Sequence, residues 1–233
     1  MVIAEAGPQG DRSGHHLIGA QAWFGHVEAH RVTLGKRYPR ARIATFQLDL
    51  TEAEDGVDNG IVVRRAPLEE GLSRALADVL IDCVDGGASV GFMLPLQPER
   101  AEAYWSGMLD SASRGERILL VAEDAEAGAV VGTIQVILAT PENQPHRGEI
   151  AKMLVHRRAR RRGVGEALMR KAETTALDAG RTLLVLDTAS ADAGRLYDRL
   201  GWQRVGVIPD YALWPDGGLV DTILFYKDLT SRT

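Results

Sequence analysis

A run of basic residues and glycines in the middle of the chain has the composition and spacing of an anion-binding site. Ile150 to Val155 is apolar and β-prone apart from Lys152, and His156 to Arg162 contains five arginines. Gly163-Val-Gly165 then opens a segment with apolar residues at helical spacing. A helix N-terminus has free N–H groups and the positive end of the helix dipole, and glycines let an anion approach the backbone. We therefore expect a strand, a basic turn and a helix that bind a phosphate, rather than a solvated charge run at a βα corner.

The spacing Arg160-x-x-Gly163-x-Gly165, after a strand that ends in Met-Leu-Val, resembles the acetyl-CoA signature of the GNAT family of N-acetyltransferases. The resemblance covers residues 61–229 and is most specific between residues 149 and 206. It implies that acetyl-CoA is the cosubstrate and that the acetyl group passes directly to an amine in a ternary complex. It also implies an α/β fold with a mixed, mainly antiparallel central sheet flanked by helices, in the order β-α-α-β-β-β-α-β-α-β-β.

This resemblance assigns cofactor contacts to the strand and to the turn that follows it. The N–H groups of Arg161 to Glu166 would bind the pyrophosphate, and arginine side chains would add positive charge. Pantetheine would pair with the strand edge through the backbones of Met153 and Val155, and the Met153 N–H would polarise the acetyl carbonyl. Ser190 stands where many family members have an asparagine that contacts the cofactor. The complete expected set is Met153, Leu154, Val155, Arg160, Arg161, Arg162, Gly163, Val164, Gly165, Glu166, Ser190 and Tyr197.

Tyr197 is the proton donor that the resemblance implies. It lies in Ala193-Gly-Arg-Leu-Tyr-Asp-Arg-Leu-Gly-Trp202, which is similar to a conserved helix end of the family. A phenol with a pKa of about 10 can protonate a leaving thiolate whose pKa is about 8.5. The alternative role for Tyr197 is packing alone, with its hydroxyl bonded to the backbone.

Glu149 is the leading candidate for the base that deprotonates the amine. It lies fourteen residues before Gly163, where histone-type members of the family carry their catalytic glutamate. Asp187, at the end of an apolar strand, is the second candidate, and a water relay is the third. The alternatives to catalysis are a surface charge or a partner of Arg147 for Glu149, and a cap of the following helix region for Asp187.

The C-terminal segment, residues 201–227, resembles the tabtoxin-resistance acetyltransferases. This implies a small primary amine as acceptor, such as an amino-acid-like antibiotic. We expect a long loop over residues 209–218, in which Asp210 and Asp216 would bind an ammonium group while Tyr211 and Trp214 form an apolar or cation–π wall. Asp187 belongs to the same expected substrate site. The alternatives are a loop that only packs on the last two strands, acetylation of proteins or peptides, and a non-catalytic CoA-binding regulatory module.

Composition excludes several other classes of protein. The chain has 233 residues and a formal net charge of −5, which argues against nucleic acid as the main partner. No apolar run approaches the roughly 20 residues that span a bilayer, and the N-terminus lacks the pattern of a secretion signal. The single cysteine, Cys83, lies in an apolar run and is expected to be a core residue, which fits a cytoplasmic protein. No metal site is expected, because His15, His16, His26 and His30 lack supporting ligands at a suitable spacing.

Sequence patterns divide the chain at about residue 60. Residues 1–60 are expected to be a poorly ordered or loosely packed extension, and residues 61–230 the acetyltransferase domain. Helices are expected to open at Pro67 and Pro98, after Gly163 and at Ala191. The apolar last strand, Leu219 to Tyr226, offers one way to form a homodimer. Strands are expected over residues 61–65, 117–123, 130–139, 150–155, 182–187, 202–208 and 219–227.

Overall fold

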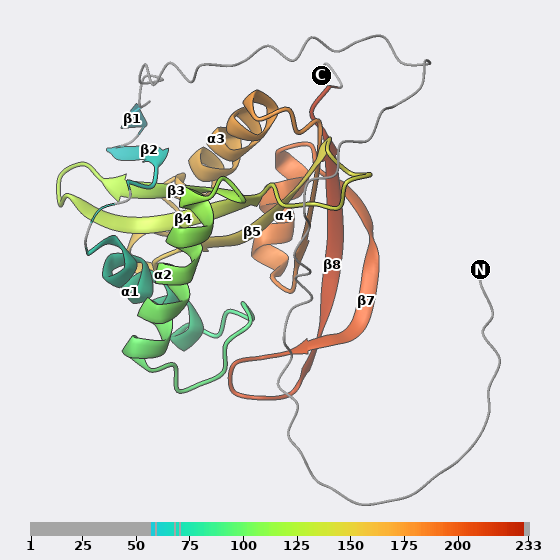
Figure 1. Ribbon diagram of the computed structural model, residues 1–233. Coiled ribbons are helices and arrows are strands. Elements are labelled where there is room, and N and C mark those ends of the chain that lie inside the picture. Colours follow the sequence, from blue (N-terminus) through green and yellow to red (C-terminus); the bar gives the residue numbers. More distant parts are fainter. Residues whose placement is uncertain (1–56, 59, 68, 70, 231–233) are drawn as a thin grey trace, which may run out of the picture. The chain divides into compact units, whose positions relative to one another are not determined.

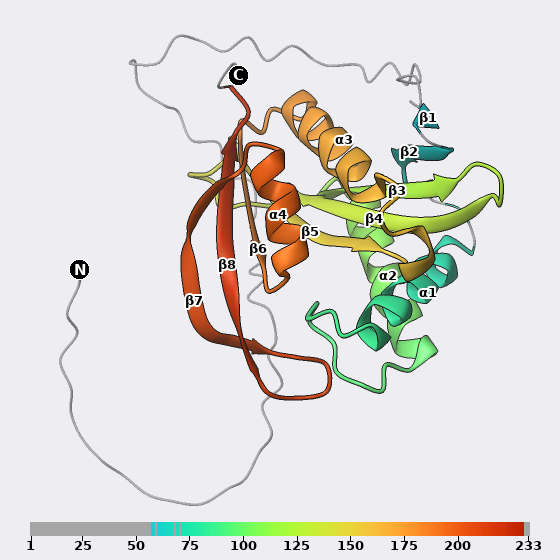
Figure 2. The same ribbon diagram turned by 180° about the vertical axis from the view of Figure 1, so that it is seen from behind.

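Eight strands form one mixed sheet in the computed structural model, which describes residues 57–58, 60–67, 69 and 71–230 (Figures 1 and 2). The strand order is β1-β2-β3-β4-β5-β6-β8-β7, and every neighbouring pair is antiparallel except β5 and β6. The strands are β1 Val57–Asp58, β2 Ile61–Arg65, β3 Arg117–Asp124, β4 Ala129–Ile137, β5 Arg147–Val155, β6 Leu183–Thr188, β7 Gln203–Leu213 and β8 Leu219–Asp228. The helices are α1 Leu72–Asp85, α2 Pro98–Ser113, the 3-10 helix η1 Arg157–Ala159, α3 Val164–Asp178 and α4 Ala191–Arg199. The predicted fold class and element order are confirmed, with the short β1 and η1 as additions.

Helices cover both faces of this sheet (Figures 1 and 2). One hydrophobic cluster joins α1 and α2 to β3, with Leu76, Leu80, Trp105, Leu119 and Val121 among its buried residues. The other joins α3 and α4 to the opposite face, with Leu120, Ile134, Leu168, Leu184 and Tyr197 among its members. Adjacent β3 residues, Leu119 to Val121, alternate between the two clusters, as the period of two in a strand requires. Because both faces are buried, β3 and β4 are apolar along most of their length.

The two strands next to the basic turn separate after a short stretch of pairing. β5 pairs with β4 over most of its length, but its parallel pairing with β6 is limited to Arg147–Glu149 against Leu183–Val185. Beyond these residues β5 continues to Val155 and β6 to Thr188 without further pairing between them. The splay that the resemblance implied is therefore present, and it leaves one edge of β5 available to a ligand.

A bulge interrupts β5 within the same segment. Thr133 pairs with Leu154 and Gln135 with Ala151, so two β5 residues lie opposite the single residue between them on β4. Lys152, inside this bulge, has a φ of 49°. A non-glycine residue in the left-handed region costs roughly 1–2 kcal/mol, so the surrounding structure must hold this conformation in place.

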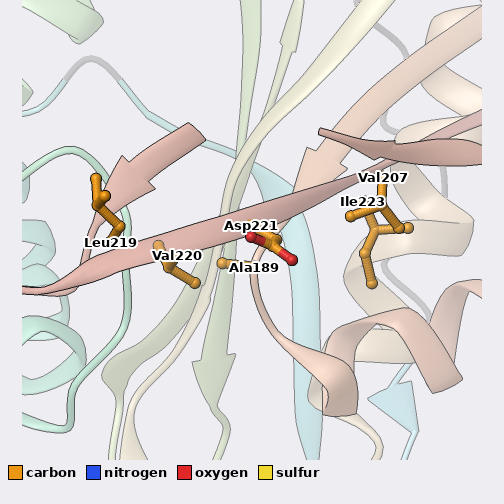
Figure 3. Close-up of a pocket in the computed structure, with 6 residues that line it drawn as sticks. All are labelled: Ala189, Val207, Leu219, Val220, Asp221 and Ile223. Carbon is orange, nitrogen blue, oxygen red and sulfur yellow. The ribbon is translucent and has the colours of Figure 1, made fainter. Parts of the chain in front are cut away.

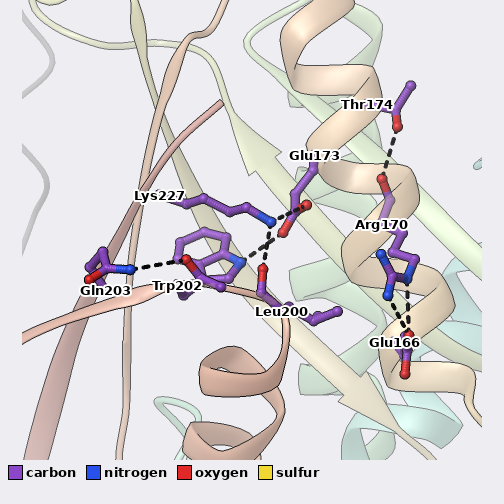
Figure 4. Close-up of polar contacts among 9 residues, drawn as sticks. Glu166, Arg170, Glu173, Thr174, Leu200, Trp202, Gln203 and Lys227 are labelled. Atoms are coloured by element: carbon purple, nitrogen blue, oxygen red, sulfur yellow. Dashed lines mark hydrogen bonds and ion pairs between the residues drawn. The ribbon is translucent and has the colours of Figure 1, made fainter. Parts of the chain in front are cut away.

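A polar cluster fixes the end of α4 against α3 and β8 (Figure 4). Glu173 on α3 accepts hydrogen bonds from Trp202 Nε1 at 2.8 Å and from Lys227 Nζ at 2.6 Å. Lys227 Nζ also donates to the carbonyl of Leu200, just beyond α4, at 2.7 Å. The Glu173 and Lys227 side chains are only 14% and 22% exposed, so the ion pair is little screened by solvent. The cluster holds α4, and with it Tyr197, in a fixed position on the sheet.

The structure changes two predictions about the C-terminal region. The first half of the expected loop over residues 209–218 is strand, because β7 extends to Leu213 and residues 214–218 connect it to β8. Pro209 and Asp210 are accommodated since β7 is the edge strand and its pairing with β8 shifts register between Ile208 and Ala212. β8 lies inside the sheet, paired with β7 on one edge and with β6 over residues 223–228 on the other, so only residues 219–222 of the predicted dimer strand keep an open edge.

Smaller differences concern helix boundaries and the start of the chain. α1 begins at Leu72, after Gly71 in a left-handed conformation, rather than at Pro67. The predicted extension and its four histidines lie outside the described residues, apart from residues 57, 58 and 60. Within the described part of the chain, no helix combines the length and the hydropathy needed to cross a bilayer.

Candidate active site

The basic turn links the free end of β5 to the N-terminus of α3. His156 caps η1 by accepting a hydrogen bond from the Arg158 N–H at Nδ1, at 3.2 Å. Arg161 and Gly163 then adopt left-handed conformations, with φ of 63° and 81°. Gly163 is the N-cap of α3 and supplies no side-chain cap, so the first N–H groups of the helix have no intrahelical partner. The turn therefore presents backbone donors at the positive end of a helix, as a phosphate site requires.

Two of the five arginines are tied to carboxylates of neighbouring elements. Asp82 on α1 accepts from the Arg157 N–H at 2.7 Å and from Arg157 Nε at 2.9 Å. Asp124, at the end of β3, accepts from Arg162 Nη1 at 2.7 Å. Burial raises the pKa of Asp82, but the hydrogen bonds from Arg157 and the charge of His156 outweigh burial and lower it overall. These pairs anchor the turn, and the exposed Arg158, Arg160 and Arg161 form no ion pair with a carboxylate among the described residues.

Gly165 lies at a junction of three elements of the site. A Cβ at this position would be 3.2 Å from Leu196 Cδ2 on α4 and 3.7 Å from Met153 Sδ on β5. Val155 Cγ2 would be 4.0 Å away. The close approach brings α3, α4 and the splayed part of β5 together, and Tyr197 follows Leu196 directly in the chain.

Tyr197 is a buried residue of α4, with 4% of its surface exposed. Its ring packs against Trp202 and Phe225, with centroids 6.0 and 5.5 Å apart. Burial raises the pKa of the Tyr197 phenol, and the nearby charge of Asp187 raises it further. The hydroxyl therefore stays protonated throughout the physiological range, which suits a proton donor. Ser190, the other residue expected here, caps α4 by accepting from the Ala193 N–H at 3.2 Å.

Three of the predicted residues meet in one cavity of about 270 Å³ beside strands β5 to β8. Glu149 from β5, Asp187 from β6 and Tyr211 from β7 all line it. Glu149 keeps 45% of its side chain exposed and lies 3.9 Å from Arg147 Nη1. The other lining residues are Val185, Leu186, Val205, Leu224, Phe225 and Tyr226.

Asp187 is the electrostatic centre of this region. Its Oδ2 accepts a hydrogen bond from the buried Thr222 hydroxyl at 2.8 Å. Its charge also raises the pKa of both Tyr197 and Lys152, so it lies within reach of the expected proton donor and of the bulge in β5. A carboxylate in this position can orient an ammonium group or accept a proton.

The tip of the β7–β8 hairpin joins the segment between α1 and α2. Ser89 Oγ donates to the Leu213 carbonyl at 2.8 Å, and the Leu94 N–H donates to the Pro215 carbonyl at 2.8 Å. Trp214 belongs to this tip and Asp210 to the bulge of β7, where the Asp210 N–H donates to Asp221 Oδ1. Neither Asp210 nor Trp214 lines the cavity that contains Glu149.

A larger pocket, of about 440 Å³, lies elsewhere on the β7–β8 hairpin (Figure 3). Asp221 is the only ionisable residue that lines it, and none of the residues predicted from the sequence does. The smaller cavity is therefore the candidate acceptor site, because it combines two carboxylates with an aromatic wall. The other lining residues of the larger pocket are Ala189, Val207, Leu219, Val220 and Ile223.

Comparison with known proteins supports the class that the fold and the turn define. The model of the acetyltransferase (GNAT) family matches residues 89–202, from the α1–α2 segment to the end of α4. A phosphinothricin acetyltransferase of the GNAT superfamily from Sinorhizobium meliloti, solved in complex with AcCoA, has a TM-score of 0.63 and 19% identity. The match covers 75% of this chain and 94% of that one.

Two further solved structures share the fold. The ribosomal-protein-alanine N-acetyltransferase from Brucella melitensis has a TM-score of 0.61 and 22% identity, covering 71% of this chain and 98% of that one. The protein yncA from Salmonella typhimurium, solved with its cofactor acetyl-CoA, has a TM-score of 0.60 and 18% identity, covering 75% and 96%. The chain thus has the fold of GNAT acetyltransferases, and the family match together with this fold supports its assignment to the GNAT family.

Proposed function

We propose that this protein is an N-acetyltransferase that transfers the acetyl group of acetyl-CoA to the primary amine of a small molecule. The observation that carries the proposal is the unpaired edge of β5, which leads directly into the glycine turn at the N-terminus of α3. An extended, amide-rich chain can add to such an edge as a strand would, while its phosphates reach the helix end. Acetyl-CoA has both parts in this order.

The residues of the turn and the bulge would hold the cosubstrate. Backbone N–H groups from Arg161 to Glu166 would bind the pyrophosphate, and the backbones of Met153 and Val155 would pair with pantetheine. Gly165 supports this arrangement, because its lack of a side chain lets α3 approach Met153 and α4 closely. In this proposal the Met153 N–H donates to the acetyl carbonyl and increases the electrophilicity of its carbon.

Acetyl transfer then needs two proton movements. The amine nitrogen attacks the thioester carbon, a C–N bond forms and the C–S bond breaks. In this proposal Glu149 takes the proton from the amine, with Asp187 or a relayed water as the alternative, since both carboxylates line the same cavity. The Tyr197 hydroxyl gives its proton to the departing thiolate and is later reprotonated from solvent.

The size of the cavity supports a small acceptor. A volume of about 270 Å³ suits a molecule of amino-acid size. The resemblance of residues 201–227 to tabtoxin-resistance acetyltransferases and the phosphinothricin acetyltransferase among the similar structures favour the same acceptor class. The ribosomal-protein-alanine N-acetyltransferase is the observation that favours acetylation of a protein N-terminus as the second candidate.

A screen of free amines and short peptides, with CoA release as the readout, tests the proposal. We expect turnover with a subset of small primary amines and none with peptides. The control is Gly163→Glu, which places bulk and negative charge at the phosphate site and should abolish acetyl-CoA binding in calorimetry. Acetyl-CoA binding without turnover on any amine would favour a non-catalytic CoA-binding module, and retained binding by the control would contradict the phosphate site.

Three further features of the protein belong to the same proposal. Residues 61–230 form the catalytic domain, with residues 1–60 as an extension to it. The protein acts in the cytoplasm, where acetyl-CoA is available. If it forms a homodimer, β7 is the strand whose outer edge is open to a second chain, because it lies at the end of the sheet.

A further inference from the structure

The bulge in β5 changes the face of the sheet on which Lys152 lies. Without the bulge, Lys152 would lie on the same face as Ile150, beneath α3. In a regular strand, residues 150, 152 and 154 would share one face. Instead Ile150 belongs to the core beneath α3, whereas Leu154 belongs to the core beneath α1 and α2. Lys152 lies with Leu154, because its Nζ is 5.9 Å from the ring centroid of Tyr104 on α2. The extra residue thus turns a charged side chain toward the face that carries Glu149 and Asp187.

Lys152 carries a partly buried charge that has no ion-pair partner among the described residues. Burial lowers the pKa of Lys152, the charge of Asp187 raises it, and the charge of Arg117 lowers it further. Among the described residues no carboxylate forms an ion pair with Lys152. Its Nζ lies 3.8 Å from the position that a Cβ on Gly91 would occupy, so the α1–α2 segment covers it. A buried ammonium without a hydrogen-bonded anion is costly, which points to a partner supplied by a ligand.

Charged groups of both signs lie on the cavity's face of the sheet, although Lys152 does not itself line the cavity. Glu149 and Asp187 line the cavity, and Lys152 is close enough to Asp187 to be stabilised by its charge. Two carboxylates attract an ammonium group, while one lysine attracts a carboxylate. An amine without a carboxylate would leave Lys152 without a partner. A molecule that has both an ammonium group and a carboxylate would pair with Lys152 as well as with Glu149 and Asp187.

We propose that Lys152 binds the carboxylate of the acceptor and directs its amine toward Glu149 and Asp187, so that the preferred substrate is an amino-acid-like amine. This inference rests on the proposed N-acetyltransferase function and names the substrate class of the same site. Arg117 does not share the role, because its Nε and Nη1 donate to Ser111 and Gln135. The phosphate turn lies beyond Val155, at the other end of the splayed segment, and binds a different anion.

Matched pairs of acceptors test this role. Each pair contains an amino acid and the amine that remains after loss of its carboxylate, and both are assayed by CoA release. The wild type should show a kcat/KM for the amino acid about 10- to 100-fold higher than for its partner, the range that one charge-assisted hydrogen bond provides. Lys152→Met, which keeps an unbranched apolar chain against Tyr104, should lower kcat/KM for the amino acid about 10- to 100-fold more than for the carboxylate-free amine and so remove the preference.

Two controls separate recognition from folding. Lys152→Met should keep or raise the Tm of the wild type without weakening acetyl-CoA binding, and Lys152→Arg should retain part of the preference because it keeps the positive charge. A wild type that acetylates both members of each pair equally would overturn this inference and leave the proposed function intact, as would an equal loss of activity toward both in Lys152→Met. A wild type that binds no acetyl-CoA, or that acetylates no amine, would overturn the proposed function and this inference with it.

Discussion

Gly163 and Gly165 are needed for different reasons, and replacing each with alanine tests these reasons separately. Gly163 has a φ of 81°, in the left-handed region, where a Cβ costs roughly 1–2 kcal/mol. Gly165 lies inside α3 and needs space rather than an unusual conformation, since its Cβ would meet Leu196 Cδ2 at 3.2 Å and Met153 Sδ at 3.7 Å. Both neighbours are ends of flexible side chains that can shift by a few tenths of an ångström.

The expected magnitudes follow from this difference. Gly163→Ala should lower the free energy of unfolding by roughly 1–2 kcal/mol, a drop of about 2–8 °C in Tm for a domain of this size. In Gly165→Ala, a gain in helix propensity of up to about 1 kcal/mol offsets the contact with Leu196, so its Tm should stay within about 3 °C of the wild type. Acetyl-CoA affinity should fall about tenfold or more in Gly163→Ala, because the first N–H groups of α3 no longer point correctly. It should change less than about threefold in Gly165→Ala, whose Cβ points into the protein.

Thermal unfolding and calorimetric titration with acetyl-CoA measure both quantities for the two variants and the wild type. The reasoning requires that the variants differ in affinity as well as in stability. If Gly163→Ala bound acetyl-CoA as tightly as the wild type, the left-handed N-cap would not position the phosphate donors. If Gly165→Ala lost acetyl-CoA affinity to the same extent as Gly163→Ala, the site would simply need small residues at both positions. The distinction between a conformational role for Gly163 and a packing role for Gly165 would then be wrong.

Three more predictions concern the proton donor, the anchor of the turn and the single cysteine. Tyr197→Phe should lower kcat at least about tenfold with unchanged acetyl-CoA affinity, measured by CoA release and calorimetry, and an unchanged kcat would exclude the phenol from the mechanism. Because the pKa of Asp82 is lowered on folding, its stabilising effect is complete above its ordinary pKa of 3.8 and is lost as the pH falls below that value. Asp82→Asn should therefore lower the Tm at pH 7, with a difference from the wild type that shrinks toward pH 3, and a constant difference would contradict this. Burial raises the pKa of the Cys83 thiol, so a thiol reagent should modify the native protein only at the rate of unfolding, and rapid native-state labelling would show otherwise.

Much of the fold could be predicted because its elements follow local rules. Apolar runs predicted β3 and β4, and the helical spacing of Leu72, Leu76 and Leu80 predicted α1. The C-terminal hairpin could not be predicted in the same way. Pro209 and Asp210 break most strands, and only the position of β7 at the sheet edge lets the strand continue through them.

In the candidate site, likewise, features set by neighbouring residues could be predicted, whereas features set by long-range contacts could not. The phosphate turn was predictable because strand, arginines and glycines are contiguous. The carboxylates that hold it were not, since Asp82 and Asp124 lie 75 and 38 residues from the arginines that they bind. Lys152 was visible in the sequence only as an interruption in an apolar strand. Nothing local indicated that a bulge would turn it toward the acceptor cavity.

In the proposed site β5 would contact two ligands, because its register changes once along its length. Before the bulge, Glu149 faces the acceptor cavity while Ile150 packs beneath α3. After the bulge, Met153 and Val155 pack on the α3 side and Leu154 on the other. The strand edge freed by the splay lies beside these same residues, so the point where the proposed acetyl group is held is also the point where Lys152 turns to the acceptor face. A single inserted residue thereby brings the proposed cosubstrate edge and the proposed carboxylate anchor together.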